Sequence, residues 1–361
     1  MLFFLALSCG IYLVFIIFII SGLFRHSVLD ISSSQELPKV SVIIAARNEE
    51  EHLPYLIQDI VNQEYPIDKI ETIIVNDRST DLTSDIIKEA SEAYSFIKHI
   101  TIHESNPHMT PKKHAITVGI EASEGEVIVA TDADCRVGKL WVSSMVYNVI
   151  KKDSIAIGYS SISGSSFFEQ YQMIDFLGIL SANAGAAGWG QFWSGSGQNL
   201  AYYKKDFNLI DGFTPVKEKL SGDDMYLVQS ISKHKNGFIN IDPNSFVTTA
   251  PMHSAKEFLN QRARWSSNSR ENITGNKLFF SFLVSSFLFN VFLVFSALFG
   301  SPWLLFFLIK STLDGLVLFL GAKLFNTKIN LIPFIYWSFI QPIYIPIIAI
   351  LGLFNHYSWK K

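Results

Sequence analysis

The stretch Glu126-Val-Ile-Val-Ala-Thr-Asp-Ala-Asp134 organises the predicted fold. Its apolar run, Val127 to Ala130, is too short and too rich in β-branched residues for a helix, which predicts a buried strand. Asp132 and Asp134 follow directly, and ligands of open α/β sheets gather at the carboxyl ends of the strands. Mg²⁺ typically binds one or two carboxylates together with substrate phosphates. The pair is therefore a candidate metal site, although an isolated D-x-D is more often a solvated turn.

Composition separates the chain into a mixed-charge centre and two apolar ends. Of its 361 residues 49% are hydrophobic, and the mean hydropathy of +0.26 is high for a soluble protein. The formal net charge of −3 offers no basic field for nucleic acid. The two cysteines, Cys9 and Cys135, lack metal-site spacing, and no disulfide is expected between them because Cys9 lies in a lipid-embedded run.

The N-terminal run from Leu2 to Leu23 is almost entirely apolar, and about 20 such residues cross a bilayer as a helix. It lacks the short apolar core, basic start and cleavage site of a signal peptide. Arg25 and His26 follow it, and basic residues favour the cytoplasmic side. We therefore expect residues 1–25 to anchor a multi-pass protein of the cell (inner) membrane, with the following domain, 38–270, in the cytoplasm.

Strands alternate with helices in the first half of that domain. Val40–Ala46 and Ile70–Val75 are predicted to be buried strands. Glu49–Glu51 are expected to begin a helix, where acidic residues complement the helix dipole. Ser79 or Thr80 is expected to cap the next helix. This alternation predicts a parallel sheet with helices on both faces.

Two lysines open the following predicted helix, which runs through Gly119 and Ile120. A lysine at this point, Lys112 or Lys113, could reach a phosphate as a mobile point charge. The alternative is an ordinary solvated helix start.

Two later segments each allow two interpretations. Phe167–Ala187 is aromatic-rich and then small-residue-rich, which is typical of an amphipathic segment on a membrane surface or of a core helix. Ser194–Ala201 is a glycine-rich loop before a short strand. Gly195 and Gly197 could let the backbone approach a ligand closely, or they serve only a tight turn.

Two charged motifs follow. Asp223 and Asp224 are expected at the start of a helix, and N-capping explains one of these acids but hardly both. In Gln261-Arg-Ala-Arg-Trp265, Arg264 could hold phosphate oxygens and Trp265 could offer an apolar platform. The motif also fits a juxtamembrane basic cluster, and both interpretations can hold together.

Residues 278–354 are apolar again and predict two to three transmembrane helices. The spans are expected at Phe279–Phe299, Pro302–Leu320 and Leu331–Phe354. A turn at Gly300–Ser301 joins the first two, and prolines in the third allow a broken or re-entrant segment. Lys310 and Asp314 lie four residues apart, so they are expected to pair.

Taken in order, these motifs make the chain resemble the membrane-bound family 2 glycosyltransferases. The matching stretches are VSVIIAARNEE at 40–50, VNDRSTD at 75–81, PKKHAITVGI at 111–120, DAD at 132–134, GDD at 222–224 and QRARW at 261–265. They cover nearly all of the region between the apolar ends, and their joint occurrence is highly specific. The resemblance implies a GT-A fold, a Rossmann-like α/β sheet that binds a nucleotide diphosphate sugar.

The resemblance also implies donor-binding residues. Those matched to the uridine and the diphosphate are Ala46, Arg47, Glu49, Asp77 and Lys112. Asp132 and Asp134 match the motif that contacts the nucleotide sugar and the Mg²⁺ or Mn²⁺ bridging its phosphates.

A second set of residues is matched to catalysis and to the acceptor. Asp224 matches the catalytic base, and Asp223 is close enough to perturb it. Gln261, Arg264 and Trp265 match a signature that closes over the diphosphate and the acceptor end.

The resemblance implies an inverting, metal-dependent transferase. It would move a sugar from a UDP-sugar, such as UDP-GlcNAc or UDP-glucose, to a polysaccharide or lipid-linked acceptor at the membrane, in contact with membrane lipid. One alternative is a single addition to a lipid, as in ceramide glucosyltransferase-like enzymes. Another is a non-catalytic nucleotide-binding membrane protein, against which the intact acids with Arg264 and Trp265 argue. The chain departs from the family pattern at Asn76, Arg78 and Pro111, and its acidic motif reads Gly-Asp-Asp rather than Glu-Asp. These departures bear on the identity of the sugar donor more than on the reaction class.

Overall fold

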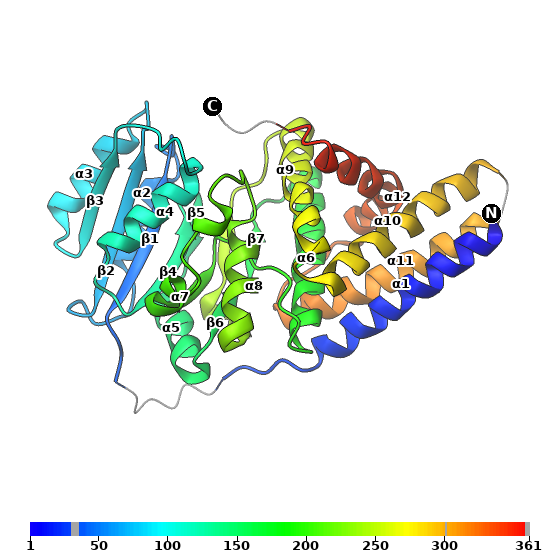
Figure 1. Cartoon of the computed structure of the whole chain (residues 1–361), viewed down its shortest axis with the longest axis horizontal. Helices are drawn as coiled ribbons and strands as arrows, with labels where there is room; N and C mark the ends of the chain where they lie inside the picture. Colours follow the sequence, from blue (N-terminus) through cyan, green and yellow to red (C-terminus); the bar gives the residue numbers. More distant parts are fainter. Residues whose placement is uncertain (30–35, 300–301, 358–361) are drawn as a thin grey trace. The chain divides into compact units, whose positions relative to one another are not determined.

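The computed structural model describes residues 1–29, 36–299 and 302–357, so the predicted turn at Gly300–Ser301 lies outside the described residues. Contacts divide the chain into two compact units (Figure 1). The sheet unit comprises Ser27–Ser161 and Ser194–Ala250, and the helical unit comprises Met1–His26, Ile162–Trp193 and Pro251–Lys361. The domain boundaries drawn from composition, 1–25, 38–270 and 278–354, stay a prediction.

The described part of the sheet unit contains a seven-stranded sheet of order β3-β2-β1-β4-β8-β6-β9. Its strands are β1 Val40–Ala46, β2 Ile70–Asp77, β3 Ile97–Ile102, β4 Val127–Asp132, β6 Ile155–Gly158, β8 Leu200–Tyr203 and β9 Gly237–Asn240. The first four in this order run parallel, whereas β8 is antiparallel to both β4 and β6. A second sheet joins β5 Cys135–Val137, β10 Val247–Thr249 and β7 Ser160–Ile162.

Helices cover both faces of the parallel strands. The helices of this unit are α2 Leu53–Val61, α3 Thr83–Ala93, α4 Pro111–Ala122, α5 Trp141–Lys152, α7 Lys204–Leu209 and α8 Asp223–Lys235. Val40, Val42 and Ile44 share one core with apolar residues of α2, α3 and α5. On the other face Gly119 of α4 lies so close that an added Cβ would stand 2.9 Å from Ile43. The predicted parallel sheet with two covered faces is confirmed.

The loop after β1 differs from the prediction. Helix α2 begins at Leu53, so Glu49–Glu51 precede it and do not form its first turn. The Glu50 carboxylate instead accepts a hydrogen bond from the Leu82 amide at 2.9 Å, and the Glu49 amide donates to Thr83 Oγ1 at 2.8 Å. The expected acidic helix start is wrong, because these residues bind the neighbouring loop.

The expected Ser or Thr cap on the next helix is wrong for the same reason. Helix α3 begins at Thr83 without a side-chain cap. Ser79 Oγ accepts from the Asn48 amide at 3.1 Å, and the Thr80 amide donates to Asn48 Oδ1 at 2.9 Å. These hydrogen bonds join the loops that follow β1 and β2.

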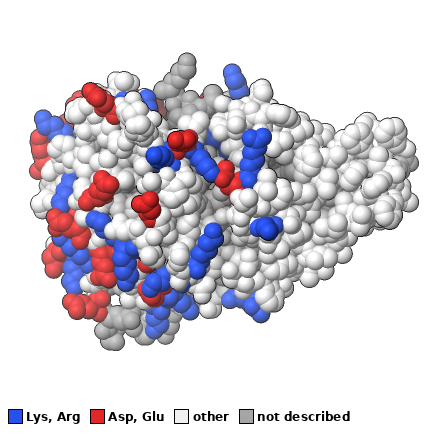
Figure 2. Space-filling view, viewed as in Figure 1, with Lys and Arg blue, Asp and Glu red and all other residues white. Residues whose placement is uncertain are grey.

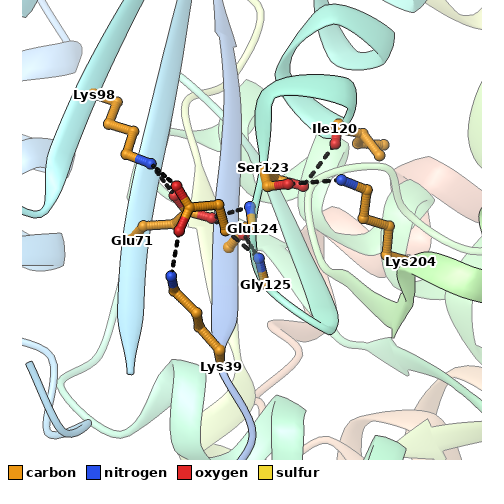
Figure 3. A network of polar contacts seen from close by, with 9 residues as sticks. Lys39, Glu71, Lys98, Ile120, Ser123, Glu124, Gly125 and Lys204 are labelled. Atoms are coloured by element: carbon orange, nitrogen blue, oxygen red, sulfur yellow. Dashed lines mark hydrogen bonds and ion pairs between the residues drawn. The ribbon is translucent and has the colours of Figure 1, made fainter. Parts of the chain in front are cut away.

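A polar network ties the parallel strands together at the opposite, amino-terminal edge of the sheet (Figure 3). Its centre is the buried Glu71 carboxylate, which accepts from Ser41 Oγ at 2.5 Å and from the Gly125 amide at 3.1 Å, and pairs with Lys98 at 2.7 Å. Glu124 pairs in turn with Lys98 at 3.1 Å. The loop that leads into β4 is thereby fixed to β1, β2 and β3.

We expect Glu71→Gln to lower the free energy of unfolding by about 1–3 kcal/mol at pH 7, because buried donors then lose a charged acceptor. Burial alone would raise the pKa of Glu71, but the hydrogen bonds from Lys98, Ser41 and the Glu124 amide outweigh it and lower that pKa below its ordinary 4.5. Ionised Glu71 therefore stabilises the fold above about pH 4.5, and this contribution disappears as the pH falls further.

Denaturation of the full chain in detergent at pH 7 and at pH 4 measures this effect. Glu92→Gln is the matched control, because Glu92 is exposed and only 4.0 Å from Lys88 in a surface pair. An equal loss for both variants at pH 7 would contradict the role of Glu71.

Within its described residues, the helical unit contains four helices that are long and apolar enough to cross a membrane. They are α1 Leu2–Leu23, α10 Lys277–Leu298, α11 Trp303–Leu324 and α12 Leu331–Leu353. In Figure 2 charged side chains of both signs are interspersed over the sheet unit, whereas α1, α10 and α11 show hardly any. Helix α12 is continuous through Pro342 and Pro346, so the broken alternative is not observed.

Helix packing in this unit buries both a predicted amphipathic or core segment and a predicted ion pair. Phe167–Ala187 forms one helix, α6, which packs against α1, α11 and α12 and buries residues on all sides, so it is a core helix. The predicted pair of Lys310 and Asp314 is confirmed at 2.5 Å, and Tyr12 of α1 donates to Asp314 at 2.7 Å. This buried ion pair thus joins α11 to α1.

Candidate active site

The carboxyl ends of three parallel strands bring predicted site residues to one edge of the sheet. In the register of β1, Ala46 lies opposite Asn76 of β2, and Ala45 lies opposite Asp132 of β4. Ala46, Asp77 and Asp132 are therefore the last residues of three adjacent strands. Loops leaving this edge carry Arg47, Glu49 and Asp134.

Asp77 is a buried carboxylate held between two guanidinium groups. Arg78 Nε donates to Asp77 Oδ1 at 2.8 Å, and Arg47 Nη1 lies 3.9 Å from Asp77 Oδ2. Arg78 adopts a positive φ of 55°, a conformation uncommon outside glycine. Glu49 follows Arg47 in the loop after β1 and pairs with His52, with 3.3 Å between Glu49 Oε2 and His52 Nδ1.

Lys112 reaches from the first turn of α4 to the end of β4. Its Nζ lies 2.7 Å from Asp132 Oδ1. Burial alone would lower the pKa of Lys112, but the negative charges of Asp132 and Asp223 outweigh burial and raise it. The lysine therefore stays cationic beside the carboxylates.

Asp134 follows Asp132 on the turn between β4 and β5. Thr249 Oγ1 donates to Asp134 Oδ2 at 3.4 Å, and Gln198 Nε2 donates to Thr249 Oγ1 at 3.1 Å. Burial raises the pKa of Asp134, and the charge of Asp132 raises it further. A metal cation bound near Asp132 and Asp134, in addition to Lys112, would thus favour the ionised form of Asp134.

The glycine-rich loop before β8 joins the two acidic motifs. A Cβ added to Gly197 would lie 3.6 Å from Asp224 Cβ, 3.7 Å from Asp223 Oδ2 and 3.9 Å from Lys112 Nζ. Because Lys112 also pairs with Asp132, the D-x-D motif, the lysine and the GDD motif converge on one place in the sheet unit.

Asp223 and Asp224 are the first two residues of α8, as predicted, but neither is its N-cap. That position is Gly222, with a φ of 82°. Asp224 accepts from the Met225 amide at 2.7 Å and from the Gly197 amide at 3.3 Å. Burial, followed by the charge of Asp223, raises the pKa of Asp224 to about 6. A carboxylate with this pKa can accept a proton near neutral pH.

The metal-binding groups at this edge fit a site in which the substrate completes the coordination of the cation. They do not fit a site that protein ligands fill alone. Within residues 1–29, 36–299 and 302–357, no group of three or more His, Cys, Asp and Glu side chains could hold a metal ion. Asp132 and Asp134 offer two hard oxygen ligands, and Mg²⁺ commonly binds one or two carboxylates and completes its shell with substrate phosphates and water.

A family model described as glycosyl transferase family 2 matches residues 41–223, half of the chain. The chain belongs to glycosyltransferase family 2. The match includes the D-x-D motif, Lys112 and Asp223. The predicted family and enzyme class are confirmed.

Relatives of this glycosyltransferase agree with the assignment. It is 30% identical over 278 residues to the probable glycosyltransferase YdaM of Bacillus subtilis (strain 168). The aligned segment covers 73% of this chain and 65% of YdaM. It is 33% identical over 126 residues to a beta-monoglucosyldiacylglycerol synthase of Nostoc sp., which is 35% of this chain and 25% of the synthase. The matches span less than two thirds of each relative's length.

A solved structure shares the fold. The mannosyltransferase PcManGT from Pyrobaculum calidifontis, in complex with GDP-Man and Mn²⁺, aligns over 98% of both chains with a TM-score of 0.66 and 17% identity. The predicted GT-A fold, with one N-terminal and three C-terminal apolar helices, is confirmed.

The last predicted motif of this glycosyltransferase belongs to the helical unit. Gln261, Arg264 and Trp265 lie on α9, Ala255–Ser267, whereas the carboxylates and Lys112 belong to the sheet unit. Whether the motif and the carboxylates act on one substrate stays a prediction.

Sequence reasoning missed the residue of this motif that is most deeply buried. Arg262 is 2% exposed; its Nε lies 2.7 Å from Asp175 Oδ2 of α6, and its guanidinium lies 4.2 Å from the centre of the Trp265 ring. Tyr344 of α12 also donates to Asp175, at 3.4 Å. The residue types of the motif gave no sign of which arginine points inward. Arg262 thus fixes α9 to α6 and α12.

We expect Asp175→Asn to destabilise the helical unit by about 3–5 kcal/mol, because it leaves the Arg262 charge buried without a counter-ion. The thermal midpoint of the detergent-solubilised protein should fall. The double variant Asp175→Leu with Arg262→Met removes both charges and should recover most of the loss. A double variant as unstable as the single one would contradict the ion-pair explanation.

Proposed function

We propose that the chain is an inverting, metal-dependent glycosyltransferase that moves a sugar from a UDP-sugar to a polysaccharide or lipid-linked acceptor at a membrane. UDP-GlcNAc and UDP-glucose are the first donors to test. The observation that carries the proposal is the convergence of Lys112, Asp132, Asp223 and Asp224 around Gly197 at the carboxyl edge of the sheet. Ligands bind at this edge in sheets of this kind.

In the proposed reaction Asp224 is the base. An acceptor hydroxyl is a weak nucleophile until a positioned carboxylate takes its proton. Asp224 is partly buried, accepts hydrogen bonds from two backbone amides and has a pKa of about 6, all of which support the role. Its neighbour Asp223 contributes the repulsive charge. One base and in-line displacement would invert the anomeric carbon.

The donor side is assigned to the strand ends. Ala46, Arg47, Glu49 and Asp77 would hold the uridine, and Lys112 would neutralise the diphosphate as it leaves. Asp132 and Asp134 would hold Mg²⁺ or Mn²⁺, which stabilises negative charge on a leaving diphosphate when bound. Gln261, Arg264 and Trp265 would close over the diphosphate and the acceptor.

Basic residues support a cytoplasmic sheet unit and an inner-membrane location. Arg25 follows α1, Lys277 begins α10, Lys323 lies in the last turn of α11 and Lys328 precedes α12. If the four helices cross the membrane alternately, all four positions lie on the side of the sheet unit, which is the side that basic residues favour.

A single addition to a lipid is the alternative, and the similarity to a beta-monoglucosyldiacylglycerol synthase favours it. The products formed from labelled UDP-sugars separate the two: a ladder indicates extension, and one product indicates single transfer. A non-catalytic nucleotide-binding protein would release no UDP with any donor.

We expect Asp224→Asn to lower kcat by about 10²- to 10⁴-fold while UDP binding persists, because the variant cannot accept the proton. Wild-type activity should rise with pH through about 6, where Asp224 becomes ionised. Released UDP measures kcat and its pH dependence. Asp68→Asn, at an exposed loop acid, is the control. Unchanged turnover in Asp224→Asn would remove this residue from the base role.

We expect EDTA to abolish transfer and added Mg²⁺ or Mn²⁺ to restore it. Lys112 is the cation beside the two carboxylates and already pairs with Asp132, so it cannot by itself neutralise a diphosphate there. Asp134→Asn should raise the metal concentration needed for half-maximal rate. Full activity in chelator would contradict the assignment of Asp132 and Asp134.

A further inference from the structure

Two adjacent lysines at the start of α4 have different environments. Lys112 is partly exposed and pairs with Asp132. Lys113 is 1% exposed, and its Nζ donates to the carbonyl of Lys219 at 2.5 Å. A fully buried ammonium carries a large desolvation cost, so its retention calls for a specific partner.

That partner lies in the segment just before α8. The Thr110 amide donates to the Lys217 carbonyl at 2.9 Å, and Thr110 Oγ1 donates to the Lys219 carbonyl at 3.3 Å. Thr110 is the N-cap of α4, where a threonine would ordinarily cap its own helix, yet its hydroxyl makes no capping bond there. The start of α4 therefore holds the 217–219 backbone through three hydrogen bonds to two carbonyl groups.

This segment leads directly into the proposed base. It continues through Gly222, whose φ of 82° turns the chain into α8, and Asp223 and Asp224 are the next two residues. Helix α8 has no side-chain cap to fix its first turn. Besides the Gly197 amide that donates to Asp224, the preceding segment therefore contributes to the position of the two carboxylates.

Charge acts in the same direction. Burial lowers the pKa of Lys113, while the charges of Asp223 and Asp224 oppose that shift. The positive charge of Lys113 near these two adjacent, partly buried carboxylates offsets part of their mutual repulsion.

We propose that Lys113 is a positioning residue: its ammonium holds the Lys219 carbonyl and thereby fixes the Gly222 turn that presents Asp224 to the acceptor. This inference rests on the proposed function only in naming Asp224 as the base. The tether itself is a structural claim that can be measured without turnover.

The test compares the full chain in detergent with two variants that weaken the tether. Lys113→Met keeps the apolar stem and removes the donor and its charge, and Thr110→Val removes one hydrogen bond without changing any charge. Lys88→Met, on the exposed face of α3, and Thr117→Val, on α4 itself, are the matched controls. Hydrogen–deuterium exchange is followed for peptides covering 214–224, together with kcat and the donor KM.

We expect Lys113→Met to raise exchange at 217–224 and to lower kcat by about 10- to 100-fold, since small misplacements of a catalytic group have effects of this size. The donor KM should change by less than about twofold, because Lys112 and Asp132 are untouched. Thr110→Val should change both readouts in the same direction by less, and the two controls should match wild type.

Unchanged exchange in both Lys113→Met and Thr110→Val would overturn the tether, and so would a rise in donor KM with kcat retained. If the wild type releases no UDP from any donor, the proposed function fails, and the exchange comparison alone then decides whether Lys113 holds the turn. If Lys113→Met does not fold, Thr110→Val supplies the same comparison.

Discussion

Parallel pairing of β1 with β2 on one side and β4 on the other is the constraint on which the rest of the site depends. All three strands run in one direction, so Ala46, Asp77 and Asp132 end at the same edge although they are far apart in the chain. The buried Glu71 network fixes the other edge. A slip of one residue would turn each alternating side chain to the opposite face, so register and site are determined together.

Strands and long apolar helices were predictable because their signals are local. The run Val40–Ala46 and the four apolar helices are identified by composition alone. The loops were not, because their partners come from elsewhere in the chain. Glu50 looks like a helix-start residue by its charge, but the Leu82 amide determines what it binds.

The same distinction explains which charges of the helical unit could be paired in advance. Lys310 and Asp314 are four residues apart on one helix, so helical spacing alone predicts their contact. Arg262 and Asp175 are 87 residues apart, on helices whose packing no local pattern specifies. Whether Arg262 or Arg264 points inward depends on that packing, and the assignment of Arg264 to phosphate oxygens did not address this question.

Electrostatics at the starts of α4 and α8 show why these two helices must be considered together. Lysines in the first turn of α4 oppose its dipole, whereas acids in the first turn of α8 agree with theirs. Even so, burial and the charge of Asp223 raise the pKa of Asp224. Lys112 and Lys113 offset the crowded acids, and the acids in turn make two cations tolerable at the positive end of α4. The lysines of α4 and the acids of α8 therefore compensate one another's charge, so the two helix starts form one electrostatic unit.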